Sequence, residues 1–354
     1  MTHAWLITGP PGSGRSNLAY AFAASLLCKN GGCSTCVDCV QVATRTHPDL
    51  QHLATEKVII TIDEVRELVQ SSSYSPSQSR WRVIVIEDAD RMAERTSNVL
   101  LKALEEPPPR TVWILCAPSE ADMLPTIRSR VRTVRLHIPA VTEVAMLICE
   151  RDGVDMSTAE RAARWSQSHI GMARRLATNE DARERRTEAL EKVLAMAGMK
   201  DVITTAARLI EIASEDANAL TEERDAAELT QLRRSMGLAD GDPVPPQLRV
   251  YVKNLEETQK RRATRSLRDG IDRILIDLMS LYRDIVRVQL GVNEHLVNLE
   301  LAAEITQAAQ RRGSEMTLAT IDAIDAARER IDRNVAPALA LEAMLVSALR
   351  RQAA

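Results

Sequence analysis

Four cysteines that lie close together in the sequence have the most specific chemistry in the chain. The spacing C-x4-C-x2-C-x2-C is formed by Cys28, Cys33, Cys36 and Cys39, and Gly31-Gly32 supplies a tight turn between the first two. Four thiolates in so short a stretch can complete a tetrahedral zinc site, which leaves no position open for catalysis. An iron–sulfur cluster is the alternative, and a disulfide pair is disfavoured in a reducing compartment. The pattern therefore predicts a structural zinc module at residues 28–39.

A glycine-rich run precedes the cysteines. It reads Gly9-Pro-Pro-Gly12-Ser-Gly14-Arg15-Ser16 and fits the pattern G-x-x-x-x-G-[KR]-S. Glycines let backbone N–H groups turn inward and a helix N-terminus adds positive potential, so the run is typical of a phosphate-binding loop. The usual lysine is replaced by Arg15, whose planar guanidinium fits poorly where a compact ammonium bridges two phosphates. Ordinary ATP binding and an inherited loop with weak or absent nucleotide binding are both open at this point.

Two acidic residues follow an apolar run, Val83 to Ile86, further along the chain. Glu87 and Asp88 would then lie at the carboxyl edge of a buried strand, where open parallel sheets bind their ligands. In a working ATPase the first acid holds Mg²⁺ and the second orients water, normally aspartate and then glutamate. Here the order is reversed, which displaces each carboxylate by about one methylene. Plain solvated carboxylates are the alternative to a modified metal site.

The elements that position these residues alternate in the first third of the chain. Short apolar runs and helical patterns in alternation are typical of a parallel sheet built from strand-helix-strand units. We predict strands at 4–8, 50–53, 82–86, 111–116 and 134–138, and helices at 19–27, 63–70 and 96–104. Beyond Pro139 the chain reads as helices, interrupted by a predicted loop at 237–246. The fold class is therefore α/β plus all-α.

Composition limits the possible functions. The 354 residues carry a net charge of −3, which argues against a whole-molecule grip on nucleic acid or on anionic membrane. No apolar stretch reaches the roughly 20 residues of a bilayer span, and no export signal opens the chain, so we expect a cytoplasmic protein. Cys116 and Cys149 have no nearby partner in the sequence and are expected to be buried small hydrophobes.

These features together resemble the clamp-loader subunits of bacterial DNA polymerase III, of the AAA+ ATPase class, and within them the delta-prime family of actinobacterial type. The resemblance is carried by the phosphate loop, the four cysteines after its helix, Asn98-Val-Leu-Leu-Lys-Ala-Leu-Glu-Glu-Pro107, Thr126-Ile-Arg-Ser-Arg130 and Gly171-Met-Ala-Arg174. A further match is the ending Asn334-Val-Ala-Pro-Ala-Leu-Ala-Leu-Glu-Ala343. The order and intervals of these motifs make the match specific over residues 6–175.

The resemblance implies roles for two arginines. Arg130 matches the arginine of the family's S-R-C motif, which reaches into the ATP site of a neighbouring subunit as a trans-acting finger and stabilises charge on the transferred phosphoryl group. Val131 stands where the family has cysteine. Arg174 matches the sensor-2 arginine of the lid. The plainer alternative for both is a solvated surface arginine.

Several departures from the family pattern favour a stator, a subunit that offers Arg130 to a neighbour and has weak or no ATPase of its own. Where relatives carry a polar sensor-1 residue, this chain has Cys116-Ala117-Pro118. The chain also starts directly before its first strand, without the segment of the family that helps to enclose adenine. The alternatives are an ATP-hydrolysing motor of tau/gamma type, and a free-standing zinc-containing nucleic-acid-binding protein that uses the basic residues of 260–268. For that basic cluster, a solvated face or an acidic partner groove is favoured over DNA phosphate.

The resemblance also implies domains and partners. We expect an AAA+ phosphate-loop domain at 1–138 that carries the zinc module, a helical lid at 139–180 and a helical collar for oligomerisation at 181–354. The expected partners are the tau/gamma and delta subunits and, indirectly, the sliding clamp and primer-template DNA. Structural Zn²⁺ is the expected cofactor, and no polymerase activity of its own is expected. Binding of ATP with Mg²⁺ in the chain's own site is left open by the resemblance.

Overall fold

The computed structural model describes residues 2–55, 59–235, 249–292 and 296–350, together with Pro245 and Glu294. The chain divides into two compact units, residues 1–174 and 175–354. None of the helices in the described part of the chain is long and apolar enough to cross a membrane. The loop predicted at 237–246 lies outside the described residues except for Pro245.

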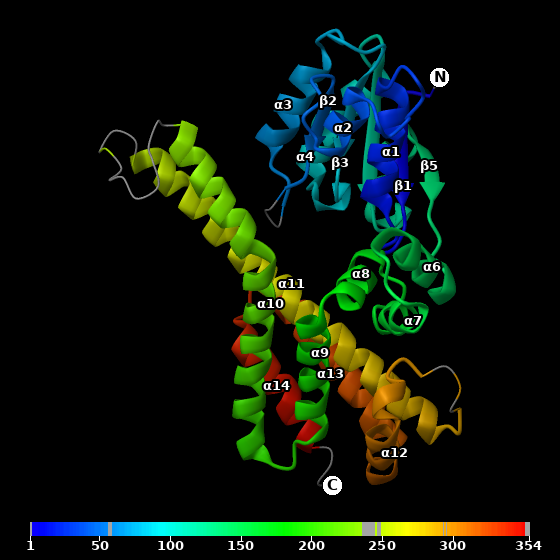
Figure 1. The fold of residues 1–354 in the computed structure, drawn as a ribbon, viewed down its shortest axis with the longest axis vertical. Coiled ribbons are helices and arrows are strands. Elements are labelled where there is room, and N and C mark those ends of the chain that lie inside the picture. Colours follow the sequence, from blue (N-terminus) through cyan, green and yellow to red (C-terminus); the bar gives the residue numbers. More distant parts are fainter. Residues whose placement is uncertain are drawn as a thin grey trace. The chain divides into compact units, whose positions relative to one another are not determined.

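The first unit is built on a five-stranded parallel sheet with the strand order β2-β3-β4-β1-β5 (Figure 1). The strands are β1 (Ala4–Thr8), β2 (Leu50–Leu53), β3 (Arg82–Ile86), β4 (Thr111–Ala117) and β5 (Arg132–Arg135). Every residue of β3 and β4 is buried, because both faces of the sheet are covered and the strands read as continuous apolar runs. The last strand is shifted from the predicted 134–138, since β5 is an edge strand whose residues are only half-buried or exposed.

Helices of the first unit cover the sheet on both faces. One face packs against α1 (Arg15–Leu27) and α2 (Val37–Ala43), and the other against α3 (Ile62–Ser72), α4 (Glu94–Glu105) and α5 (Pro125–Arg128). Short 3-10 turns at Ala89–Arg91 and Glu120–Asp122 follow β3 and β4. The unit continues through α6 (Val141–Asp152), α7 (Met156–Trp165) and the start of α8 (Ile170–Thr178).

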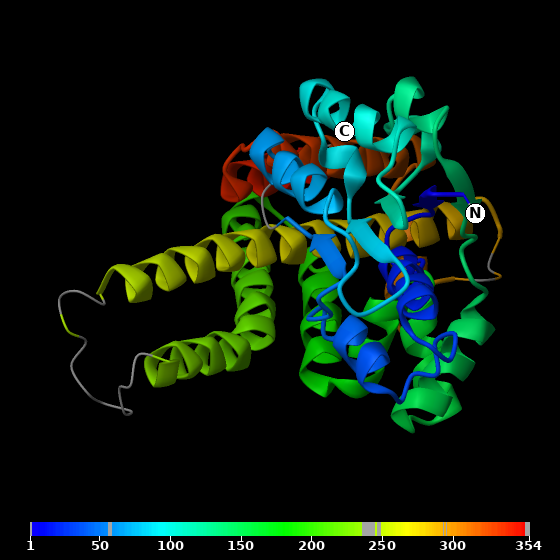
Figure 2. The same ribbon diagram turned by 90° about the horizontal axis from the view of Figure 1, so that it is seen from above.

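The second unit is helical over its described residues. Its elements are α9 (Glu180–Leu194), α10 (Met199–Ser235), α11 (Arg249–Gln289), a 3-10 turn (Leu299–Leu301), α12 (Ala302–Arg311), α13 (Ser314–Asp332) and α14 (Pro337–Arg350). Helices α10 and α11 run side by side (Figures 1 and 2). Helix α11 buries one apolar face, because Ile271, Leu275, Leu278 and Tyr282 all lie in the core of this unit.

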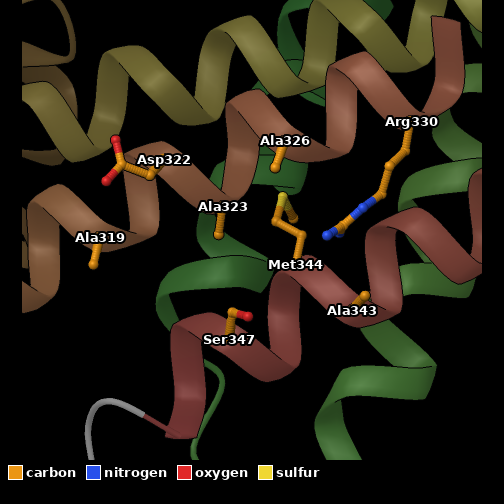
Figure 3. Close-up of a pocket in the computed structure, with 8 residues that line it drawn as sticks. All are labelled: Ala319, Asp322, Ala323, Ala326, Arg330, Ala343, Met344 and Ser347. Atoms are coloured by element: carbon orange, nitrogen blue, oxygen red, sulfur yellow. The ribbon is translucent and has the colours of Figure 1, made fainter. Parts of the chain in front are cut away.

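A groove of about 250 Å³ lies between the packed helices α13 and α14 of this unit. Small side chains line most of it, among them Ala319, Ala323 and Ala343, and the Arg330 side chain extends over the groove toward Met344 (Figure 3). Small residues at these positions let the two helix backbones approach one another, which brings Met344 into the core.

Candidate nucleotide site, cysteine cluster and arginine finger

The phosphate loop lies where the sequence predicts it, between β1 and α1. Gly12 and Gly14 have φ values of +82° and +87°, a conformation that side chains disfavour and that a tight inward-turning loop requires. The Gly9 N–H donates to the Pro118 carbonyl at 3.2 Å, which ties the loop to the end of β4. The loop therefore lies at the carboxyl edge of the sheet beside its central strands, the usual place for a ligand in a parallel sheet.

Arg15 turns back onto the loop instead of pointing outward. Its Nη1 donates to the Gly9 carbonyl, and its Nη2 lies 3.6 Å from Asp88 Oδ1. The side chain is mostly buried, with 12% of its surface exposed. The one cation that the loop offers to a phosphate is thus already neutralised by a carboxylate of the same chain.

Glu87 is surrounded by donors from its own chain. It accepts hydrogen bonds from the Ser16 hydroxyl and, at 2.8 Å, from the Tyr20 hydroxyl, and Arg45 Nη2 lies 3.3 Å from the same carboxylate. The Arg45 guanidinium also stacks over the Tyr20 ring at 4.7 Å from its centre. Burial, followed by the charge of Glu87, raises the pKa of Tyr20, so its hydroxyl stays a donor. The residues that would hold Mg²⁺ therefore contact one another and their neighbours, and Mg²⁺-ATP would have to displace these contacts.

The turn after β3 adds two further carboxylates. Asp88 has a φ of +49°, and it pairs with Arg91 at 3.4 Å as well as with Arg15. Asp90 is half-buried, and burial raises its pKa, with the charge of Asp88 acting in the same direction. A left-handed conformation at a non-glycine residue is uncommon and is concentrated at functional sites.

The helical segment of the first unit closes over the phosphate loop. Ile170 N–H donates to the Gly12 carbonyl at 3.2 Å. A Cβ added at Gly12 would lie 2.2 Å from the His169 ring, so the imidazole packs directly on the loop backbone. The Arg174 side chain, the predicted sensor-2 residue, pairs with Asp152 of α6 at 2.8 Å.

The position predicted to lack a sensor-1 side chain is apolar in the structure. Cys116 lies in β4 opposite Ile7 and is fully buried, as predicted, and burial raises the pKa of its thiol to about 12. A neutral thiol there cannot orient a water by charge. The expectation for Cys149 is only partly correct, because that residue is half-buried on α6, with its Sγ 3.9 Å from the Met156 sulfur.

The four cysteines come together as predicted. Their sulfur atoms all lie within 4.8 Å of one another, and the Cys28–Cys36 and Cys28–Cys33 sulfurs are 3.5 and 3.8 Å apart. A tetrahedral zinc with Zn–S bonds of about 2.3 Å places its sulfurs about 3.8 Å apart, so the cluster fits that ion.

Local hydrogen bonds prepare some of these sulfurs for a cation. The backbone N–H and the hydroxyl of Thr35 lower the pKa of Cys33 to about 6. Burial raises the pKa of Cys39 to about 12, a shift that a coordinating cation would reverse because it deprotonates a bound thiol. The Cys36 sulfur accepts from the Cys39 N–H at 3.5 Å and so caps α2, which fixes the turn between these two cysteines.

Arg130 lies in the turn between α5 and β5. Its Nε donates to Glu105 Oε1 at 2.6 Å, and its Nη1 donates to the Thr126 carbonyl at 2.7 Å and to the Ser129 hydroxyl at 2.9 Å. The turn is anchored by Ile127, which is fully buried, and by Val131, which packs against the same core. Val131, at the position where the resemblance implies cysteine, thus helps to anchor the turn.

Arg130 and the phosphate loop lie at opposite ends of the parallel strands, Arg130 at the amino end and the loop at the carboxyl end. Arg130 comes before the first residue of β5, and the loop follows the last residue of β1. The two strands are parallel neighbours, with Trp5 opposite Arg132 and Thr8 opposite Arg135. A strand rises about 3.3 Å per residue, so about 20 Å separates the levels of Arg130 and the loop. Arg130 is therefore directed away from the phosphate loop of its own chain.

The basic cluster at 260–268 is partly neutralised by acidic residues of the same unit. Arg262 lies 2.5 Å from Asp225 and 2.9 Å from Glu228, both on α10, and Arg265 lies 3.7 Å from Asp269. These pairs favour the interpretation of a solvated, internally paired face over that of a phosphate-binding surface.

Sequence reasoning missed Tyr20, Arg45, His169 and Glu105. Tyr20 follows Ser16 by four residues on α1 and so shares its face, a signal that could have been used. Arg45, His169 and Glu105 are brought to the site by tertiary folding, and no local pattern marks them.

The first unit is thus a phosphate-loop α/β domain with an inserted cysteine cluster. The family model "DNA polymerase III, delta subunit" matches residues 1–140, and the model "DNA polymerase III, delta subunit, C terminal" matches residues 266–348. Together these matches cover more than half of the chain. The chain belongs to the DNA polymerase III clamp-loader subunit family, which includes delta′ and gamma/tau.

Individual relatives match the N-terminal part. The delta′ subunit of Pseudomonas aeruginosa is 39% identical over 134 residues, which are 36% of this chain and 41% of that protein. The delta′ subunit of Bacillus subtilis is 31% identical over 137 residues, 38% of this chain and 42% of that protein. The gamma/tau subunit of Mycobacterium tuberculosis H37Rv is 34% identical over 167 residues, 45% of this chain and 29% of that protein. The chain thus spans less than half the length of these curated relatives.

Solved structures match the chain with low TM-scores. A DNA polymerase III gamma subunit-related protein from Thermotoga maritima is 17% identical, with a TM-score of 0.42 over 99% of this chain and 95% of that one. The RuvB Holliday junction branch migration motor of Thermotoga maritima is also 17% identical, with a TM-score of 0.35 over 67% and 75% of the two chains.

Proposed function

We propose that this chain is a stator subunit of delta-prime type in the DNA polymerase III clamp loader. In this role Arg130 completes the ATP site of a neighbouring subunit, and the chain itself has weak or no ATPase. The observation that carries the proposal is the position of Arg130 at the edge of the sheet opposite its own phosphate loop. An arginine finger stabilises the charge that spreads over the transferred phosphoryl group, and it does so at a site that faces it.

The closed phosphate loop supports the same role. Arg15 is neutralised by Asp88, and the Glu87 carboxylate is occupied by Ser16, Tyr20 and Arg45. ATP with Mg²⁺ would have to displace all these contacts, and each broken charge-assisted contact lowers the net affinity. Cys116 offers no polar group to a hydrolytic water.

The wider assembly follows from this role. The partners are the tau/gamma and delta subunits, and through them the sliding clamp and primer-template DNA, with no membrane involved. The AAA+ domain at 1–138 with its zinc module, the lid at 139–180 and the collar at 181–354 form the proposed division of the chain. Cys28, Cys33, Cys36 and Cys39 would hold a structural zinc, which supplies cross-links and no open coordination position. In this proposal the zinc module and the phosphate loop both have structural roles and no catalytic one.

Equilibrium ATP binding to the purified chain separates a stator from a motor. A stator binds Mg²⁺-ATP with a dissociation constant weaker than about 1 mM. A motor of tau/gamma type binds in the micromolar range, and its binding is lost in an Arg15→Ala variant. Micromolar binding that depends on Arg15 would replace the stator with a motor.

A further inference from the structure

Almost every N–H donor of Arg130 is already used inside its own chain. A guanidinium has five such donors. Nε donates to Glu105 Oε1 and Nη2 forms an ion pair with the same oxygen, while Nη1 donates to the Thr126 carbonyl and the Ser129 hydroxyl. All three nitrogens of the guanidinium thus have a contact within the chain.

The two groups of contacts cover different edges of the guanidinium. The Thr126 and Ser129 contacts come from the turn that carries Arg130, and they hold the Nη1 side. Glu105 covers the edge formed by Nε and Nη2 and comes from the last residue of α4. That edge is a fork of parallel donors, which is the geometry that a phosphate uses when it binds arginine through two hydrogen bonds. Glu105 and a phosphoryl group therefore compete for the same donors.

Both side chains of this pair are partly exposed, 32% for Arg130 and 47% for Glu105. Ion pairs with this exposure are weak and open easily, because water screens them. The carboxylate is backed by α4, whose Leu104 and Leu100 are fully buried, so Glu105 does not move away with the finger. Glu105 is thus held in place by α4, while the exposed ion pair that it forms with Arg130 is easily broken.

We propose that Glu105 is a latch that keeps Arg130 folded against its own chain until the triphosphate of a neighbouring subunit displaces the carboxylate. This inference rests on the proposed function of Arg130. As the guanidinium turns its Nε/Nη2 edge to the phosphate, it also gives up the Nη1 contacts, so Thr126 and Ser129 hold Arg130 only in the latched state. The latch limits the finger to neighbours that have ATP bound.

The test uses the reconstituted loader with Glu105→Ala, and Glu106→Ala as the matched control, because Glu106 is the exposed neighbouring carboxylate on the same segment. The latch predicts that Glu105→Ala raises ATPase without clamp and DNA by about two- to threefold, the range set by an exposed ion pair. Glu106→Ala leaves the rate unchanged. The gain disappears in the Glu105→Ala/Arg130→Ala double variant, because the latch acts only through Arg130.

A second readout does not depend on what Arg130 does to ATP. In the isolated chain, an arginine-specific dicarbonyl reagent modifies Arg130 about two- to threefold faster in Glu105→Ala than in Glu106→Ala, measured by peptide mass spectrometry. Equal modification rates in the two variants overturn the latch. A Glu105→Ala loader that is as slow as Arg130→Ala also overturns it, since Glu105 would then support the active finger. Faster modification with normal ATPase in Arg130→Ala refutes the finger and leaves standing only the restraint of Arg130 by Glu105.

Discussion

The Arg15 guanidinium and the Asp88 carboxylate lie 3.6 Å apart across the mouth of the phosphate loop. In a phosphate-loop ATPase these two positions face outward, one toward the phosphates and the other toward the metal or the water. Here they face one another, and Ser16 and Glu87 form a second such contact beside them. The loop has kept the backbone shape of a nucleotide site, while its side chains neutralise one another.

The packing of His169 on the phosphate loop predicts a large cost for a methyl group there. Gly12→Ala would place a Cβ 2.2 Å from the His169 ring at a φ of +82°, and we expect a loss of about 2–4 kcal/mol from strain and overpacking together. Gly153→Ala is the matched control, since Gly153 has a φ of +69° with open space around it. Its expected loss is about 1 kcal/mol. Chemical denaturation compares the two, and equal losses would contradict the contact.

The cysteine cluster predicts a metal content. Cys39→Ser should remove the bound metal, about one zinc per chain in the wild type, and lower Tm by about 5 °C or more, because structural zinc contributes directly to folding. Cys149→Ser is the control, since Cys149 lies on α6 outside the cluster and should keep the zinc. Metal analysis of carefully purified protein is the measurement. Wild-type protein that is stable with little zinc would refute the assignment.

Asp49 predicts a pH dependence of stability. Burial raises its pKa, but the backbone N–H groups of Ser77, Ser79 and Gln78 outweigh burial and hold the pKa below its usual value. Its stabilisation is therefore complete above the unfolded pKa of about 4 and is lost as the pH falls through the lower folded pKa. Asp49→Asn should cost about 3 kcal/mol at pH 6, because the amide cannot accept all these bonds.

Denaturation of wild type and Asp49→Asn across the acid range measures this effect. The gap between their free energies of unfolding should shrink below about pH 4. Asp63→Asn is a suitable control, because Asp63 is exposed and forms a surface ion pair with Arg66 one turn along α3, so its change should stay within about 0.5 kcal/mol. A gap for Asp49→Asn that is constant from pH 6 to about pH 2 would contradict the account.

Local patterns predicted the parts of the site that are built from consecutive residues. The phosphate loop, the strand before Glu87 and the four cysteines depend on short-range spacing, and each lies where the sequence predicts it. Edge strand β5 was misplaced because half-exposed residues give little apolar pattern. Contacts such as Arg130 with Glu105 join residues separated by a buried strand. These contacts form only when elements that are distant in the sequence pack together, and no local sequence pattern encodes that packing.

The most direct test of the stator account compares two variants of this chain in the reconstituted loader by steady-state ATPase. Arg130→Ala removes the finger, and Arg15→Ala alters the chain's own phosphate loop. The account predicts that Arg130→Ala lowers the rate by about tenfold, because one neighbouring site loses its finger, and that Arg15→Ala leaves it unchanged. An unchanged rate with Arg130→Ala, together with a loss in Arg15→Ala, would contradict the account and identify the chain as an ATPase motor.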